Sequence, residues 1–162
     1  MIEKFLNFII SCVVVLTILF ILLTFGVKLV GLHPYIVSSG SMEPNFHVGS
    51  LVYAKEVDCR TLQPGDAISF SIGNDTMVTH RIYEVKYEDN SPVFITKGDA
   101  NNVVDAGQVH KEQIVGKVVM NLPYLGYIIE LLKTTKGKII AIGFALILFL
   151  SLKLCKVLKN GQ

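Results

Sequence analysis

The feature that most constrains this chain is a long apolar stretch near its N-terminus. Residues 5–27 contain no charged side chain, and the first charge after them is Lys28. Since a helix rises about 1.5 Å per residue, this stretch would extend about 34 Å and could cross a hydrocarbon core of about 30 Å. A cleaved secretory leader has a shorter apolar region and a small-residue exit site, which this stretch lacks. We therefore expect residues 1–4 to be a cytoplasmic N-terminus and residues 5–27 to be a transmembrane anchor.

A second apolar stretch lies near the C-terminus, after a polar and basic segment. No side chain from Ile139 to Leu152 is charged, and lysines flank the stretch on both sides. A span needs about 20 apolar residues, but lysine stems can lie along a helix while their ammonium groups reach the interface. We predict an amphipathic connector over residues 125–138. Over residues 139–158 we predict a helix that either spans the membrane or dips into one leaflet.

The region between these stretches has the pattern of a small β domain. Short runs of branched and aromatic residues cover residues 50–54, 67–72, 77–87, 93–96 and 114–120. Clusters of Gly, Pro, Asn and Asp separate the runs, at a spacing typical of an antiparallel barrel or sandwich. We predict a mostly β fold, in which a small antiparallel β-barrel-like domain over residues 33–124 carries N- and C-terminal transmembrane helices.

Composition argues against several functional classes. Lysine and arginine number 15 against 13 acidic residues and are scattered, so we expect no nucleic acid partner. The three cysteines stand far apart, which excludes a disulfide framework and a Cys-x-x-Cys site. The four histidines lack zinc spacing, and the segment that begins at Asp99 lacks the glycine and glutamate of a calcium loop. We expect neither a metal nor a cofactor.

Candidate catalytic residues occur in two segments of the β region. Ser41 follows Gly40 in the run Ser-Ser-Gly-Ser-Met-Glu-Pro, where a glycine would allow a backbone conformation that other residues resist. On its own such a run is typical of an ordinary turn. His80 shares a predicted strand face with Val78 and Ile82, which is typical of a packed histidine or of a general base.

Two carboxylates follow in a third segment, at Asp99 and Asp105. A serine–histidine pair needs a carboxylate that fixes the imidazole tautomer and stabilises the imidazolium formed during catalysis. From the residues alone either aspartate could serve. Asp99 could equally belong to a solvated turn that bonds its own backbone.

In this order, and between two apolar segments, the motifs resemble type I signal peptidases. The motifs are Ser-Gly-Ser-Met-Glu-Pro at residues 39–44, Gly65-Asp66, Thr79-His80-Arg81 and Lys-Gly-Asp-Ala-Asn-Asn-Val-Val-Asp at residues 97–105. The resemblance covers about residues 33–128. It points to the branch shared by the endoplasmic reticulum enzyme, archaea and the sporulation-associated form of Gram-positive bacteria, which has histidine where the common bacterial enzyme has lysine. Ala100 departs from the family pattern and leaves the loop spacing near Asp99 open.

The resemblance implies catalytic roles for four residues. Ser41 would be the nucleophile and His80 the general base. Asp105 is our preferred partner for the histidine, with Asp99 as a structural or supporting acid.

It also implies binding roles in the serine segment. The amide of Ser41 and the hydroxyl of Ser39 would form an oxyanion hole, and Gly40 would allow the backbone between them. We expect Met42 to contact lipid or substrate.

The expected function is that of a membrane-anchored serine endopeptidase that removes signal peptides from secreted and membrane preproteins. Its partners would be those preproteins, the lipid bilayer, and the secretion translocon or partner subunits. We expect a multi-pass protein of the cell membrane with the peptidase domain on the extracytoplasmic face, or alternatively of the endoplasmic reticulum membrane with a lumenal domain. The alternative function is a membrane-tethered, non-catalytic β-barrel binding module or subunit. A self-cleaving repressor-like peptidase would need DNA-binding helices and a lysine base, which the sequence does not offer.

Overall fold

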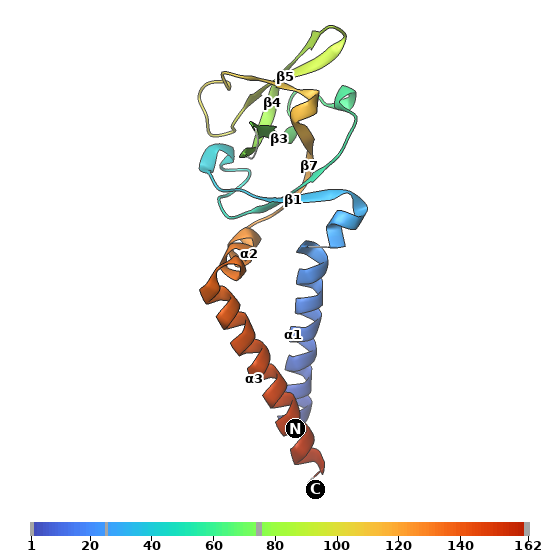
Figure 1. The fold of residues 1–162 in the computed structure, drawn as a ribbon, viewed down its shortest axis with the longest axis vertical. Helices are drawn as coiled ribbons and strands as arrows, with labels where there is room; N and C mark the ends of the chain where they lie inside the picture. The colour runs from blue at the N-terminus through green and yellow to red at the C-terminus, as the bar shows by residue number, and fades with distance from the viewer. Residues whose placement is uncertain (1, 25, 74–75, 161–162) are drawn as a thin grey trace. The chain divides into compact units, whose positions relative to one another are not determined.

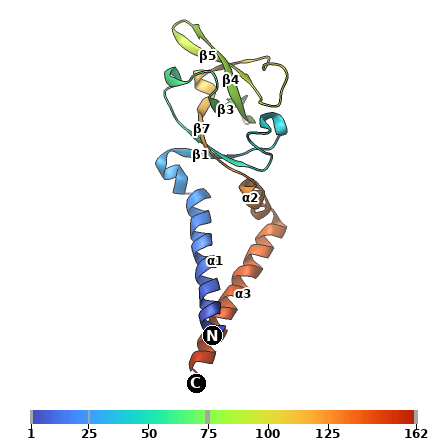
Figure 2. The same ribbon diagram turned by 180° about the vertical axis from the view of Figure 1, so that it is seen from behind.

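The computed structural model describes residues 2–24, 26–73 and 76–160, and the chain divides into two units (Figures 1 and 2). One unit is Val27–Tyr127, and the other combines Met1–Gly26 with Ile128–Gln162. Residues 1 and 25 belong to the segments predicted as cytoplasmic N-terminus and anchor, and they lie outside the described residues.

The second unit consists mainly of two long helices. Helix α1 is Ile2–Thr24 and helix α3 is Thr135–Asn160. The short helix α2, Leu125–Lys133, precedes α3, so the predicted connector over residues 125–138 holds α2 and the first turn of α3. The hydroxyl of Thr134 accepts a hydrogen bond from the amide of Gly137 at 3.0 Å, which caps the start of α3.

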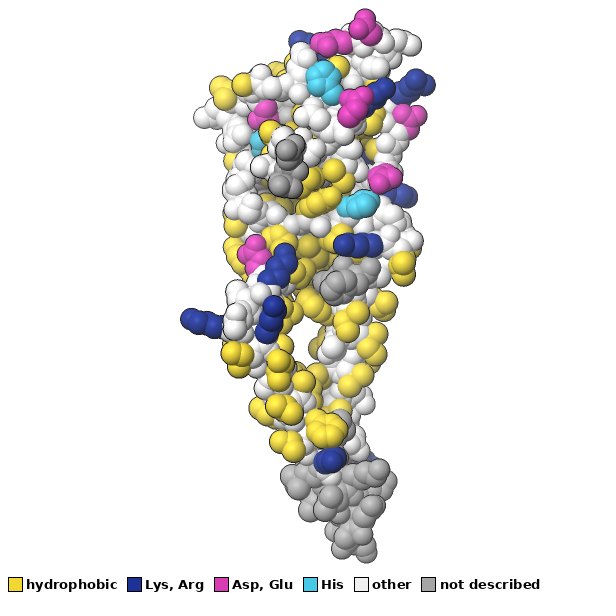
Figure 3. Space-filling view, viewed as in Figure 1, with side chains coloured by type: hydrophobic (Ala, Val, Ile, Leu, Met, Phe, Trp, Pro, Cys, Tyr) yellow, Lys and Arg dark blue, Asp and Glu magenta, His cyan; other side chains and the backbone are white. Residues whose placement is uncertain are grey.

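Apolar side chains cover much of both long helices on the face drawn in Figure 3. Among the described helices, no single one combines the length and the apolar character that crossing a bilayer requires. Helix α2 and the part of α3 up to Ser151 meet that requirement only together, with a bend of 97° between them. The transmembrane spans at residues 5–27 and 139–158 therefore stay predictions.

The first unit is built on one antiparallel sheet, which confirms the mostly β domain predicted between the apolar segments. The sheet has seven strands in the order β1-β2-β7-β3-β4-β5-β6, with β1 and β6 at its edges. The strands are β1 Leu32–Ile36, β2 Leu51–Lys55, β3 Ala67–Ile72, β4 Thr76–Glu88, β5 Ser91–Lys97, β6 Gln108–His110 and β7 Ile114–Leu122. The hairpin of β4 and β5 extends away from the rest of the sheet (Figures 1 and 2).

The sequence did not predict the two edge strands. Strand β1 contains Pro34, which pairs with Tyr53 of β2. Proline lacks a backbone donor but is tolerated on an edge strand, where one side of the backbone needs no partner strand. Strand β6 has only three residues and pairs with β5.

The hydrophobic core of the sheet fixes the positions of β4 and β5, the strands that carry His80 and Thr96. Ile68 of β3, Ile82 of β4 and Phe94 of β5 are each at most 2% exposed and belong to one hydrophobic cluster. Burial of such side chains contributes about 2–3 kcal/mol each. Ile82 lies two residues after His80, and Phe94 lies two residues before Thr96. The cluster therefore fixes the register of β4 against β5 close to these two polar residues.

Candidate active site

Ser41 lies in a short 3₁₀ turn, Gly40–Met42, within the loop between β1 and β2. The side chain of Met42 is 1% exposed and anchors this turn in the domain. The carbonyl of Ser41 accepts a hydrogen bond from the amide of Ala100 at 2.9 Å. A Cβ at Gly98 would lie 2.6 Å from the same carbonyl oxygen, so only glycine allows this close approach. Ser41 is thus held both by the core and by residues 98–101.

Gly40 does not have the backbone conformation that the sequence suggested. Its φ lies outside the left-handed region, and a Cβ there would lie 3.6 Å from Cγ of Glu43, an ordinary contact. The expectation that Gly40 is needed for a backbone that other residues resist is therefore wrong in this structure.

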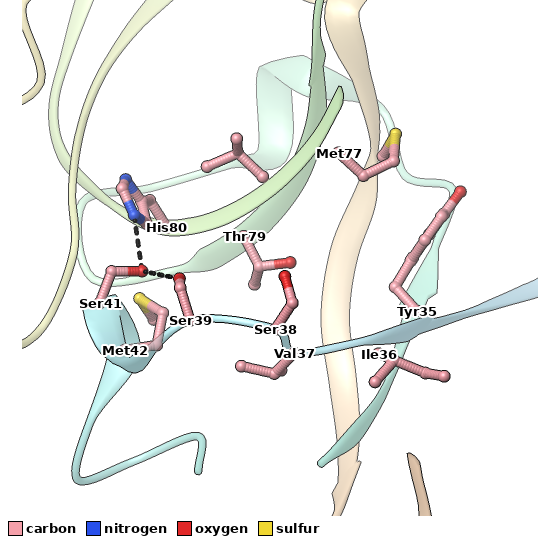
Figure 4. A pocket seen from close by; sticks show the side chains of 11 residues that line it. Tyr35, Ile36, Val37, Ser38, Ser39, Ser41, Met42, Met77, Thr79 and His80 are labelled. Atoms are coloured by element: carbon pink, nitrogen blue, oxygen red, sulfur yellow. Dashed lines mark hydrogen bonds between the residues drawn. The ribbon is translucent and has the colours of Figure 1, made fainter. Parts of the chain in front are cut away.

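His80 of β4 lies between Ser41 and Asp105. Its Nε2 is 3.0 Å from Oγ of Ser41 and its Nδ1 is 2.6 Å from Oδ2 of Asp105. An ionised carboxylate only accepts hydrogen bonds, so Nδ1 donates to Asp105 and the neutral ring presents Nε2 as an acceptor for the serine hydroxyl. Only 12% of the His80 side chain is exposed, so little water competes for these contacts. Figure 4 shows the contact between His80 and Ser41 at one end of a cavity.

Asp105 is fixed by a residue that the sequence did not single out. Oδ2 of Asp105 accepts a hydrogen bond from the hydroxyl of Thr96 at 2.7 Å, and the amide of Asp105 donates to the Thr96 carbonyl at 2.9 Å. Thr96 lies in β5 and is fully buried. These two hydrogen bonds hold the Asp105 carboxylate within hydrogen-bonding distance of Nδ1 of His80.

Asp99 has a different set of partners. Arg81 donates to it from Nε at 2.7 Å and from Nη2 at 2.6 Å, and Asn45 donates from Nδ2 at 2.8 Å. The hydrogen bonds from Arg81 are the main reason that the pKa of Asp99 lies below its ordinary value, and the bond from Asn45 acts in the same direction. The same pairing raises the pKa of Arg81. The structure thus brings Asp105, and not Asp99, against His80.

A cavity of about 280 Å³ opens beside Ser41 and His80 (Figure 4). It is lined by Tyr35, Ile36, Val37, Ser38, Ser39, Ser41, Met42, Met77, Val78, Thr79 and His80. Oγ of Ser39 lies 3.2 Å from Oγ of Ser41, so its hydroxyl is close to the nucleophile candidate. Because Met42 is buried, lipid contact is excluded for it in this structure, and substrate contact remains as a prediction. Burial raises the pKa of Tyr35 at the far end of the cavity.

Sequence reasoning missed Thr96, Asn45 and Gly98, which support the site. Thr96 and Gly98 lie inside or beside the motif quoted for the resemblance, but nothing local identifies their partners. Asn45 directly follows the Met-Glu-Pro run and reaches Asp99 far along the chain. No group of three or more His, Cys, Asp or Glu side chains within the described ranges could hold a metal ion.

Comparison with known proteins gives curated relatives that are signal peptidases. The chain is 44% identical over 79 residues to signal peptidase I W of Bacillus subtilis (strain 168), covering 48% of this chain and 42% of that protein. It is 35% identical over 102 residues to the human signal peptidase complex catalytic subunit SEC11C, covering 57% of this chain and 53% of that protein. It is 33% identical over 102 residues to the signal peptidase complex catalytic subunit SEC11 of Scheffersomyces stipitis, covering 57% and 61%.

No family model matches the chain. The chain spans about half the length of the curated relatives it matches. These relatives confirm the resemblance to signal peptidases that the motifs indicate.

Proposed function

We propose that this chain is a serine endopeptidase that removes signal peptides from secreted and membrane preproteins. The observation that carries the proposal is the hydrogen-bonded series Ser41–His80–Asp105 beside a cavity. Nucleophile, base and orienting carboxylate are the three parts that acyl transfer by a serine requires. The signal peptidase relatives support the choice of preproteins as substrate.

In the proposed reaction, Oγ of Ser41 attacks the carbonyl carbon of the scissile bond while its proton passes to Nε2 of His80. The imidazolium then gives this proton to the leaving amine, and an acyl ester on Ser41 remains. A water molecule, deprotonated by the same nitrogen, attacks the ester and releases the signal peptide with a new carboxylate. Asp105 stabilises the positive ring in both steps because its Oδ2 accepts the hydrogen bond from Nδ1–H throughout.

The negative oxygen of the tetrahedral intermediate needs donors near Ser41. We propose the amide of Ser41 and the hydroxyl of Ser39, whose oxygen is 3.2 Å from Oγ of Ser41. A single donor of this kind is worth about 3–4 kcal/mol in other serine hydrolases. Gly40 separates the two donors along the chain, and Met42, which lines the cavity, would form part of the wall that the substrate meets.

The substrate would bind as an extended strand. The amide of Val37 donates to Ser50, so by alternation the backbone groups of Ile36 and Ser38 face the open edge of β1. On the opposite wall, residues 77–80 of β4 pair with β3 only, since the pairing with β5 begins at Arg81. A peptide between these two backbones can hydrogen-bond to both. The small volume of the cavity favours small side chains before the scissile bond.

We further propose that the apolar segments anchor the enzyme in a membrane. Residues 5–27 and 139–158 supply the apolar length, and the many exposed apolar side chains that the structure describes within them, such as Phe8, Leu16 and Ile147, would be unfavourable in water. A multi-pass protein of the cell membrane with an extracytoplasmic peptidase domain would meet preproteins as they emerge, and in a eukaryote the equivalent location is the lumen of the endoplasmic reticulum. Such a location also favours contact with a translocon or with partner subunits.

The decisive experiment compares Ser41→Ala with Ser38→Ala in the full-length chain, reconstituted in vesicles with a radiolabelled preprotein. Ser41→Ala is expected to lower the cleavage rate by about 10⁴-fold or more, because it removes the hydroxyl that is hydrogen-bonded to Nε2 of His80. Ser38→Ala removes a hydroxyl from the same cavity and should retain kcat within about threefold of wild type. A cleavage rate of Ser41→Ala equal to that of wild type would rule out Ser41 as the nucleophile. A folded wild-type chain that cleaves no preprotein would favour the non-catalytic binding module.

A further inference from the structure

The first turn of α2 contacts the loop that carries Ser41. The amide of Gly126 donates to the carbonyl of Gly49 at 2.9 Å. A Cβ at Gly126 would lie 2.7 Å from that carbonyl oxygen and 2.7 Å from Cγ2 of Ile36. Gly49 has φ +79°, and a Cβ there would lie 2.1 Å from the ring of Tyr127. Two glycines are therefore required for this close approach, one on each side of the contact.

A second contact joins the same region to the residues next to the serine. The ring of Tyr124 stacks on the ring of His47, with centroids 6.3 Å apart and planes 5° from parallel. Nδ1 of His47 pairs with Oε2 of Glu43, and Oε1 of Glu43 accepts from the amide of Val48 at 3.2 Å. Glu43 follows Ser41 by two residues. A displacement of Tyr124 would thus reach the serine through the ring stack with His47 and the hydrogen-bonded pair of His47 and Glu43.

Gly49 also controls the end of the loop that borders the cavity. Its amide donates to the carbonyl of Val37 at 2.8 Å, and the amide of Val37 donates to Ser50 at 2.9 Å. Val37 lines the cavity and leads directly into Ser38 and Ser39. Both ends of the serine loop are therefore tied to the backbone that α2 contacts.

From these contacts we infer that residues 124–127 position the nucleophile, and that Gly49, Gly126 and Tyr124 are positioning residues for catalysis. The inference rests on the proposed function for its effect on rate. None of the three residues lines the cavity, so none contacts a bound substrate directly, and the loop is their connection to Ser41. A group in this role affects kcat more than KM, because misplacing a reacting atom by about 1 Å can cost about 10²-fold in rate.

The test uses two glycine pairs in the full-length chain. Gly126→Ala inserts a methyl group against Gly49 and Ile36, whereas Gly143→Ala adds the same group in helix α3, where nothing lies within 4 Å. Gly49→Ala combines a left-handed φ with a clash, whereas Gly73→Ala has a left-handed φ of +64° and open space. We expect Gly126→Ala and Gly49→Ala to lower kcat at least tenfold with KM within about threefold of wild type. Gly143→Ala and Gly73→Ala should keep kcat, even if Gly73→Ala lowers the unfolding midpoint.

Hydrogen exchange supplies a readout that does not depend on activity. Because the Ala100 amide donates to the Ser41 carbonyl, Gly126→Ala should speed exchange in residues 41–50 and 98–101 relative to Gly143→Ala. Wild-type kcat together with wild-type exchange in Gly126→Ala would overturn the inference. If Gly126→Ala does not fold, Tyr124→Ala takes its place, because it inserts no atoms. It should lower kcat severalfold and speed amide exchange in the same residues. A Tyr124→Ala variant with wild-type kcat and wild-type exchange would also overturn the inference. A wild-type chain without peptidase activity would refute the proposed function. The exchange data would still show whether residues 124–127 hold the loop that carries Ser41 in place.

Discussion

The two aspartates that follow β5 have contrasting surroundings. Asp99 faces a guanidinium that carries its charge permanently, and its side chain is 11% exposed. Asp105 is 26% exposed and faces a histidine ring and a neutral hydroxyl, neither of which carries a permanent charge. An ion pair with arginine is complete before any substrate arrives, so it can fix structure but cannot respond to the reaction. A carboxylate beside an imidazole gains its full attraction only when the ring takes a proton, which is the moment that catalysis requires.

The largest effect should come from Asp105→Asn. The amide can present NH₂ to Nδ1 of His80, which would favour the tautomer with the proton on Nε2 and leave Ser41 without a base. We expect kcat for preprotein cleavage to fall about 10³–10⁴-fold, with a thermal unfolding midpoint close to that of wild type. A fall in kcat of less than about tenfold would show that Asp105 does not have the catalytic role that its contact with His80 suggests.

A smaller effect is expected from Thr96→Val, which keeps the shape of the side chain and removes the donor to Asp105. One lost hydrogen bond of this kind, at about 1.4 kcal/mol, corresponds to about tenfold in kcat. Thr61→Val is the matched control, since the hydroxyl of Thr61 donates to the Asp58 carbonyl at 2.7 Å and Thr61 neither lines the cavity nor contacts the two aspartates. Equal kcat values for the two variants would contradict a supporting role for Thr96.

Asp99→Asn should have the smallest effect on rate and a clear effect on stability. The variant leaves the Arg81 guanidinium with a neutral partner, and we expect it to lose about 2 kcal/mol of unfolding free energy. The kcat measured well below the unfolding midpoint should fall less than it does in Thr96→Val. A fall in kcat as large as that of Asp105→Asn would remove the distinction between the two carboxylates.

The pH dependence of stability sharpens the same contrast. Arg81 lowers the pKa of Asp99 in the folded chain, so the stabilisation is fully present above the ordinary aspartate pKa of about 4. It is lost as the pH falls through the lower folded pKa. The unfolding midpoint of wild type should therefore drop more steeply below about pH 4 than that of Asp99→Asn, and parallel curves would contradict this assignment.

The sequence predicted the central strands well because their residues alternate or form short buried runs. Strand β3 begins and ends where the pattern of residues 67–72 indicated. Strand β1 was missed because Pro34 argues against a strand unless its position at the sheet edge is known. Strand β6 was missed because three residues carry no usable periodicity. The first failure arises from sheet order, which local sequence does not encode, and the second from the shortness of the strand.

For the site, the residues alone indicated Ser41, His80 and the two aspartates but left the partner of the histidine open, and the resemblance favoured Asp105. The choice of Asp105 depends on the path of the segment after Lys97, where Gly98 passes close to the Ser41 carbonyl and Asp99 turns to Arg81. Thr96 gains its place only through the register of β5 against β4. These contacts join distant parts of the chain, and so they could not be read from any single segment.

Pro34 has a consequence for how long a strand the open edge of β1 can accept. Since Val37 is hydrogen-bonded to Gly49 and Ser50, directly before β2, alternation turns the nitrogen of Pro34 toward the open side, where a partner strand would find no N–H donor. An added peptide can keep its ladder near Ile36 and Ser38 but must leave it at Pro34. The open edge of β1 can therefore pair with only a few residues of an extended peptide. It is too short for the edge strand of a second copy to pair along its whole length, which opposes edge-to-edge aggregation of the domain.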